Sequence, residues 1–216
     1  DALPISEMDG VLKQFRMYVQ DGEIDQELFE MSSEHIVFSN LSGFLEEKYA
    51  YGSSYNIENE QFLLFSDQSH LYYIEKTKSK YSCLFELLVK EKVNFSDFWE
   101  HQHSNLQWLI DRGIIIVDLD GYLKINVPKV YILKDLYEHD VICPQYYDDE
   151  LKSIVDEWCR NGDLKLENTL FSKPEQDYLD YKLNKASYSN GLDLRNKYAH
   201  STYTKNENTQ YVDYIN

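Results

Sequence analysis

The chain has 216 residues, 43% of them hydrophobic, which is enough for one domain or two small ones with buried cores. Its formal net charge of −17 argues against a general DNA-coating role, because an acidic surface repels the nucleic-acid backbone. The charge is uneven: residues 1–150 hold 12 Lys and Arg against 28 Asp and Glu, whereas residues 151–216 hold 9 against 10. The near-neutral C-terminal part is therefore the better place for a contact with nucleic acid.

The sequence also bears on compartment and cofactors. No apolar run approaches the length of a transmembrane helix, and no signal-peptide pattern opens the chain. Cys83, Cys143 and Cys159 lie far apart and form no CxxC pair, which is typical of free thiols in a reducing cytoplasm. We therefore predict a cytoplasmic protein without a membrane segment, a zinc site or another cofactor.

The first six residues have an unusual sequence. Residues 1–6 (Asp-Ala-Leu-Pro-Ile-Ser) match the translation of the end of a common sequencing adapter. We expect this stretch to be an artefact and the chain to be a fragment whose own sequence begins near Glu7.

Residues 7–79 are predicted to form an N-terminal α/β segment. Apolar residues recur at helical spacing over residues 8–20, and again over residues 43–52. Two apolar runs, residues 61–65 and 71–74, flank a polar stretch and predict a hairpin near 61–76.

Residues 80–128 have the pattern of a winged-helix-like module. Helices are expected from Tyr81 to Lys90, from Asn94 as a capping residue, and from Ser104 to Arg112. A β-rich run at 114–118, an Asp-Gly turn signal and a returning run at 122–125 predict a two-stranded wing.

This module is poorly equipped for DNA. In the expected recognition helix only Arg112 is certainly cationic, and Asp118 and Asp120 lie in the wing turn. Phosphate contacts are made mainly by Lys and Arg, which acidic residues oppose. We therefore do not expect DNA binding, and favour a packing or protein-contact role. His101 and His103, two residues apart, would diverge on a helix and do not predict a metal site.

The remaining chain is predicted to be helical. Residues 129–147 are expected to be a connector, and residues 148–216 a helical domain with helices at 148–160, from Pro174, and from Gly191. Residues 211–216 read as the start of a further helix. The predicted fold class is mainly α with minor β: a winged-helix-like module followed by a helical bundle that is truncated at its C-terminus.

The stretch from Gly191 to His200 carries the one constellation that suggests a chemistry. Asn196 and His200 are four residues apart, so on a helix they share a face. Arg195 and His200 are five apart and point about 140° away from each other on a straight helix. Either the helix ends near His200, or the site is shared between two copies of the chain.

The Arg195-Asn196-x3-His200 spacing, with Leu194 and Ala199 around it, resembles the R-x4-6-H motif of the HEPN superfamily. These helical domains include many RNases of bacterial defence, abortive-infection and toxin systems. The resemblance covers roughly residues 144–216, and Ser201 stands where such proteins often have Gly. Family members usually finish with an apolar helix, of which residues 211–216 would be only the beginning.

The resemblance implies a metal-independent endoribonuclease that cleaves RNA through attack of the 2′-OH on the adjacent phosphate. His200 would act as general acid or base, Arg195 would clamp the transition state, and Asn196 would orient the site. It also implies a homodimer in which two motifs line one cleft, with RNA as the partner. Lys197 or Tyr203 would be weaker RNA contacts.

Two other interpretations stay open. Arg195 could pair with a carboxylate and His200 could stabilise a helix C-terminus, while Leu194 and Tyr198 pack in the core. Some HEPN domains bind partners without catalysis, so a non-catalytic HEPN-like or winged-helix interaction or regulatory module is the alternative function.

Overall fold

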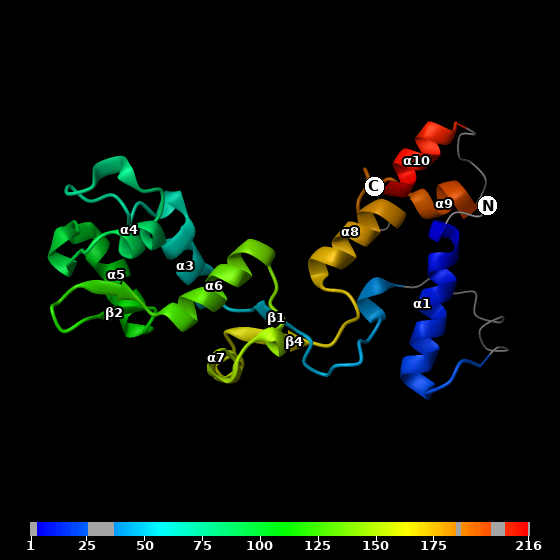
Figure 1. Ribbon diagram of the computed structural model, residues 1–216, viewed down its shortest axis with the longest axis horizontal. Coiled ribbons are helices and arrows are strands. Elements are labelled where there is room, and N and C mark those ends of the chain that lie inside the picture. Colours follow the sequence, from blue (N-terminus) through cyan, green and yellow to red (C-terminus); the bar gives the residue numbers. More distant parts are fainter. Residues whose placement is uncertain (1–3, 26–36, 185–186, 200–205, 216) are drawn as a thin grey trace. The chain divides into compact units, whose positions relative to one another are not determined.

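The structure is a computed structural model that describes residues 4–25, 37–184, 187–199 and 206–215 (Figure 1). The chain divides into two compact units. We call Asp1–Lys48 with Asn168–Asn216 the terminal unit, and Tyr49–Glu167 the central unit. Each has its own apolar core. The predicted class, mainly α with minor β, is confirmed.

Five helices make up most of the central unit, all of whose residues are described: α3 (Tyr55–Phe65), α4 (Leu84–Lys90), α5 (His103–Asp111), α6 (Val127–His139) and α7 (Asp149–Arg160). Their apolar faces meet in one core. Side chains without any exposed surface include Leu64, Leu84, Leu87, Leu106, Leu109, Ile132 and Leu133. Burial of this apolar surface is the main force that holds the unit together.

Two short antiparallel strand pairs complete the central unit. β1 (Tyr49–Gly52) pairs with β4 (Leu164–Glu167), with Tyr49 opposite Glu167. β2 (Ile115–Val117) pairs with β3 (Leu123–Ile125), and Gly121 takes a positive φ of 83° in the turn between them. The predicted two-stranded wing is therefore confirmed.

The prediction of a middle helix in the winged-helix module is wrong. Between α4 and α5 the chain makes only two single turns of 3-10 helix, Phe95–Asp97 and Glu100–Gln102. Asn94 does not cap a helix with its side chain; instead its N–H donates to the Asp97 carboxylate at 2.8 Å. Two short turns separated by two residues therefore stand in place of the continuous helix that the apolar pattern suggested.

The predicted hairpin near 61–76 is also wrong, because residues 61–65 belong to α3 and residues 71–74 form a turn followed by irregular chain, with no strand. The buried face of α3 is made of Ile57, Glu60, Leu63 and Leu64, which follows helical spacing. The charged residue Glu60 takes a core position on that face. The apolar run that follows it then looks like a strand when read alone.

Two more expectations need correction. Residues 49–52 form a strand and not a helix, with Ala50 fully buried. Residues 129–147 are not a connector, because α6 packs against α3 and α7 and places Ile132 and Leu133 in the core. α7, assigned above to the HEPN-like domain, belongs to the central unit.

The terminal unit contains α1 (Pro4–Asp21), α8 (Lys173–Leu183), α9 (Leu194–Ala199) and α10 (Glu207–Ile215) among its described residues. The helices predicted at 8–20, from Pro174 and at the chain's end are confirmed. Ser172 and Glu175 form a capping box that fixes the start of α8. A small core of Leu12, Phe38, Leu41 and Leu183 holds the unit together. No helix in the described part of the chain has both the length and the apolar character needed to cross a membrane.

Candidate functional site

The residues of the predicted motif begin on α9, whose position depends on Gly191. A Cβ at Gly191 would lie 2.9 Å from the Asn184 oxygen and 3.1 Å from the Tyr181 oxygen, so a larger side chain does not fit. The next residue, Leu192, donates its N–H to the Tyr181 carbonyl at 2.8 Å. These contacts hold the chain against α8, and the helix therefore starts at Leu194 and not at Gly191 as predicted.

The core-facing side of α9 agrees with the sequence prediction. Leu194 is 3% exposed and Tyr198, one turn later, is 9% exposed. The helix packs against α1 and α8. This packing sets the direction in which the neighbouring polar side chains point.

Arg195 lies in the first turn of α9 and reaches toward α1. Its Nη2 atom is 3.8 Å from the Asp9 Oδ2 atom, and its side chain keeps 24% of its surface exposed. The same Asp9 oxygen is 3.3 Å from the Lys13 ammonium group. Arg195 and Lys13 therefore both lie beside the same carboxylate of α1.

Asn196 is exposed, and its Nδ2 donates to the Asp193 Oδ1 at 2.8 Å. Asp193 has a positive φ of 54° directly before the helix. The amide is therefore engaged with the start of its own helix. His200 and Tyr203 lie outside the described residues, so the roles predicted for them stay predictions.

Asp213 of α10 is a site neighbour that the sequence analysis missed. Its Oδ2 accepts hydrogen bonds from the Tyr198 hydroxyl, at 2.7 Å, and from the Lys197 ammonium group. Burial opposes ionisation of Asp213, but these two bonds outweigh it and hold its pKa below the usual value. Lys197 thus ties α9 to α10, and its ammonium group already has an anionic partner there.

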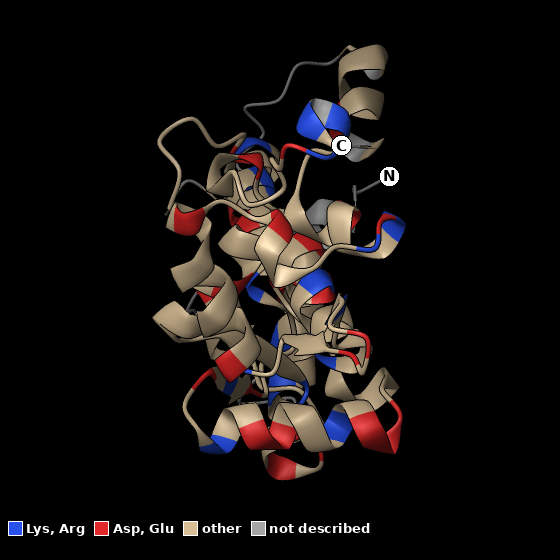
Figure 2. Cartoon of the chain, turned by 90° about the vertical axis from the view of Figure 1, so that its left-hand side faces the viewer, with Lys and Arg blue, Asp and Glu red and all other residues tan. Residues whose placement is uncertain are grey.

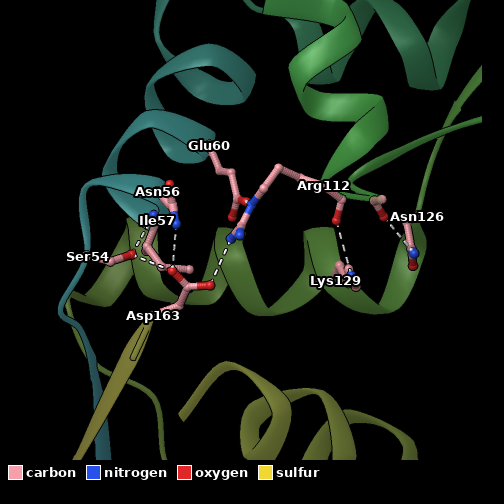
Figure 3. Close-up of polar contacts among 9 residues, drawn as sticks. Ser54, Asn56, Ile57, Glu60, Arg112, Asn126, Lys129 and Asp163 are labelled. Atoms are coloured by element: carbon pink, nitrogen blue, oxygen red, sulfur yellow. Dashed lines mark hydrogen bonds and ion pairs between the residues drawn. The ribbon is translucent and has the colours of Figure 1, made fainter. Parts of the chain in front are cut away.

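The second polar centre is in the central unit, around Arg112. Figure 3 shows the guanidinium between two carboxylates that come from different elements. Its Nε donates to Glu60 Oε1 on α3 at 2.6 Å, and its Nη2 donates to Asp163 Oδ2 at 2.9 Å. Arg112 directly follows α5, and Asp163 follows Gly162, whose φ of 77° turns the chain back after α7. One side chain therefore links three helices.

Three side chains donate hydrogen bonds to the Asp163 carboxylate. Its Oδ1 accepts from the Ser54 hydroxyl at 2.7 Å and from the Asn56 amide at 3.0 Å (Figure 3). Burial alone would raise its pKa, but the hydrogen bonds from Ser54, Arg112 and Asn56 reverse that effect and lower it. Asp163 is therefore a buried carboxylate whose ionised form the surrounding hydrogen bonds favour.

Glu60 has the opposite character. It has no exposed surface, and its Oε2 makes no hydrogen bond. Burial raises the pKa of Glu60, and the hydrogen bond and charge of Arg112 offset this only in part, while the negative charge of Asp163 raises it further. Lys129 is the other cation near it, and it is occupied with the Arg112 carbonyl at 3.2 Å.

This arrangement predicts a pH-dependent effect of Glu60→Gln. A carboxyl group whose pKa is raised on folding stabilises the fold at low pH, and that contribution is lost as pH rises through the folded pKa. The variant lacks this loss, so its stability relative to the unchanged protein should increase as the pH rises from about 4, near the ordinary pKa of a glutamate, toward neutrality. Urea unfolding followed by tryptophan fluorescence measures the difference. Glu58→Gln, an exposed neighbour on α3, is the control, and a difference that is flat with pH would contradict the assignment.

The Arg112 centre also bears on the winged-helix interpretation. Arg112 was the one certain cation of the expected recognition helix, and it points to Glu60 and Asp163 instead of outward. In the wing, Asp118 accepts from the N–H groups of Asp120 and Tyr122 and pairs with Lys124 at 2.8 Å. Figure 2 shows basic and acidic segments interspersed. The arrangement offers little for a DNA backbone.

We compared the chain with models of protein families, with curated proteins and with solved structures, and found no match. In the described residues, no three His, Cys, Asp or Glu side chains are placed to hold a metal ion together.

Proposed function

We propose that the chain carries a HEPN-type, metal-independent endoribonuclease site, in a cytoplasmic protein of a bacterial defence or toxin system. The residues of the site are Arg195, Asn196 and His200. The observation that supports this best is the state of Arg195. Its guanidinium is partly exposed, and its pair with Asp9 is long at 3.8 Å, so it can exchange a carboxylate for a phosphate.

The reaction follows from these residue types. The 2′-OH of RNA loses its proton and attacks the adjacent phosphorus, and the 5′-oxygen leaves after gaining a proton. His200 transfers protons because its ordinary pKa is near neutrality. Arg195 offers a planar, permanently charged fork to the phosphate oxygens as negative charge builds up. Asn196 lies next to Arg195 and would release Asp193 to orient the site.

The site would be completed in a homodimer, which accommodates the angle of about 140° between Arg195 and His200 on one helix. α10 supports this proposal. Its Tyr211, Val212 and Ile215 are 64%, 49% and 61% exposed. Their spacing places Tyr211 and Ile215 on one helical face beside Val212. Two copies that pair through α10 would bury this apolar surface.

A second candidate is a non-catalytic interaction module. The pairs Arg195–Asp9 and Lys197–Asp213 both place a carboxylate beside a cation of the motif. Carboxylates at these positions reduce the attraction for RNA. In this case the terminal unit would bind a protein partner, and the motif would only stabilise the unit.

The test separates the two candidates. Labelled single-stranded RNA is incubated with the protein in EDTA, and cleavage is followed on a gel. The RNase proposal expects cleavage that EDTA leaves unchanged and that His200→Ala reduces by about 10²–10⁴-fold. His139→Ala, an exposed histidine of α6 in the central unit, is the matched control and should cleave normally. Absence of cleavage by the folded protein, or full activity of His200→Ala, favours the module.

A further inference from the structure

A groove on the central unit is lined by residues that the proposed function does not use. It lies between the end of α4 with the two residues that follow it, and β3 with the start of α6. Its volume is about 520 Å³. We call it the lysine groove; its lining residues are Leu88, Val89, Lys90, Glu91, Lys92, Tyr122, Leu123, Lys124, Ile125 and Val127.

The floor of the lysine groove belongs to the core, whereas its apolar walls are open. Leu88 and Leu123 are 6% and 1% exposed. Val89 and Val127 are 55% and 64% exposed and face the same hollow. Exposed apolar surface gathered in a concave site is typical of a surface that binds a partner.

Cations surround these walls. Lys90, Lys92 and Lys124 line the groove and are exposed. Lys76 is close to them, since its Nζ donates to the Lys92 carbonyl at 2.8 Å. Lys80 is also close, since it pairs with the lining residue Glu91 at 2.7 Å. In a chain with a net charge of −17, such a concentration of lysines is unusual.

Two of the lysines that line the groove remain largely exposed in their ion pairs. Lys124 pairs with Asp118 at 2.8 Å while 56% exposed, and Lys90 lies 3.7 Å from Glu86 while 57% exposed. Exposed ion pairs of this kind contribute little, because water screens them. A carboxylate of a partner can therefore replace the internal one without a large loss.

The lining favours an acidic peptide over nucleic acid. The groove contains no arginine, and Tyr122 is half-buried with Lys92 over its ring at 5.7 Å, so it offers no open face for base stacking. Apolar side chains of a peptide would instead fill the hollow between Val89 and Val127, with its carboxylates at the lysine rim.

We propose that the lysine groove is a docking site for an acidic, amphipathic peptide segment of a protein partner, with Lys90, Lys92 and Lys124 contacting its carboxylates and Val89 and Val127 its apolar side chains. The arrangement has the apolar centre and polar rim of protein interfaces. This site lies in the central unit and does not depend on the RNase proposal.

In the test, a displayed library of random 12-residue peptides is selected for binding to the full chain. The proposal expects enriched peptides that combine Asp or Glu with Leu, Ile, Val or Phe. Their dissociation constants should rise by about tenfold or more in the triple variant Lys90→Glu, Lys92→Glu, Lys124→Glu, and should also rise with salt. Val127→Asp is a second, single variant; it puts a carboxylate at the start of α6, where a helix tolerates one, and should weaken binding too.

The control is Lys134→Glu, Lys152→Glu, Lys165→Glu, which makes the same change in net charge outside the groove and should leave binding within about twofold. The proposal is overturned if no acidic-apolar peptides are enriched, or if the groove and control variants bind equally. It is also overturned if a 12-nucleotide single-stranded RNA binds through the three groove lysines more tightly than the selected peptides.

Discussion

Arg112→Met should lower the free energy of unfolding of the central unit by about 3–5 kcal/mol. The substitution leaves the carboxylates of Glu60 and Asp163 buried without their common cation. An uncompensated buried charge costs far more than the loss of an exposed ion pair. The change also unlinks α3 from the turns that follow α5 and α7.

Urea unfolding followed by tryptophan fluorescence measures this effect in the right place. The chain's three tryptophans, Trp99, Trp108 and Trp158, all lie in the central unit, so the signal reports that unit alone. Arg160→Met is the matched control. Arg160 is exposed and donates to the Asp156 carbonyl of its own helix, so its loss should cost about 0.5 kcal/mol or less. Equal effects of the two variants would show that Arg112 does not hold the unit together.

Adding Glu60→Gln and Asp163→Asn to Arg112→Met should restore part of the lost stability. The two amides remove the buried negative charges that Arg112 neutralised. Recovery would identify charge, and not only lost packing against Trp108, as the cause of the damage. A triple variant less stable than Arg112→Met would point to packing and hydrogen bonding instead.

Under the RNase proposal, Arg195→Ala should reduce RNA cleavage by about 10²–10³-fold, because it would remove the charge proposed to stabilise the transition state. Arg195→Lys should recover only part of the rate, since an ammonium group lacks the planar fork that fits two phosphate oxygens. Cleavage rates under saturating RNA, with circular dichroism as a check of folding, measure both effects.

Asp9→Asn distinguishes a catalytic role of Arg195 from a structural one. Both Arg195→Ala and Asp9→Asn break the ion pair between α9 and α1. If the pair only supports the fold, both variants should lose stability and activity together. If Arg195 binds phosphate, Asp9→Asn removes a competitor and should tighten RNA binding while Arg195→Ala weakens it. Parallel losses in both variants would contradict the proposed role.

Local patterns in the sequence predict much of this fold. Helical spacing identifies α1, α7 and α8, and the Asp120-Gly121 turn signal identifies the wing. These features depend on residues close together in the chain. The pairing of β1 with β4 joins Tyr49 to Glu167, and no local signal predicts such a contact.

The Arg112 centre could not be predicted for the same reason. Glu60 and Asp163 are 52 and 51 residues away from Arg112 in sequence. Glu60 also interrupts the apolar stripe of α3. The residue that is buried in the Arg112 centre is therefore the same one that made the helix hard to predict from the sequence. A charged residue at a core position in an otherwise regular stripe is a usable signal for a buried partner of opposite charge.

The candidate site shows a similar division. The spacing of Leu194 and Tyr198 correctly predicts the core-facing side of α9. The start of the helix was misplaced because the backbone contacts of Gly191 with α8 delay it. Asp9 and Asp213, the carboxylates that pair with Arg195 and Lys197, come from other helices and carry no local signal.

The most direct measurement of the proposed function is the chemistry of the RNA ends. A short RNA with a mapped cleavage position is incubated with the protein in EDTA, and the products are identified by mass spectrometry. The same RNA carrying a single 2′-deoxynucleotide at that position is treated in parallel. We expect 2′,3′-cyclic phosphate and 5′-hydroxyl ends from the first RNA, and no cleavage at the deoxy position of the second. Cleavage at the deoxy position, or products with 5′-phosphate ends, would contradict attack by the 2′-OH.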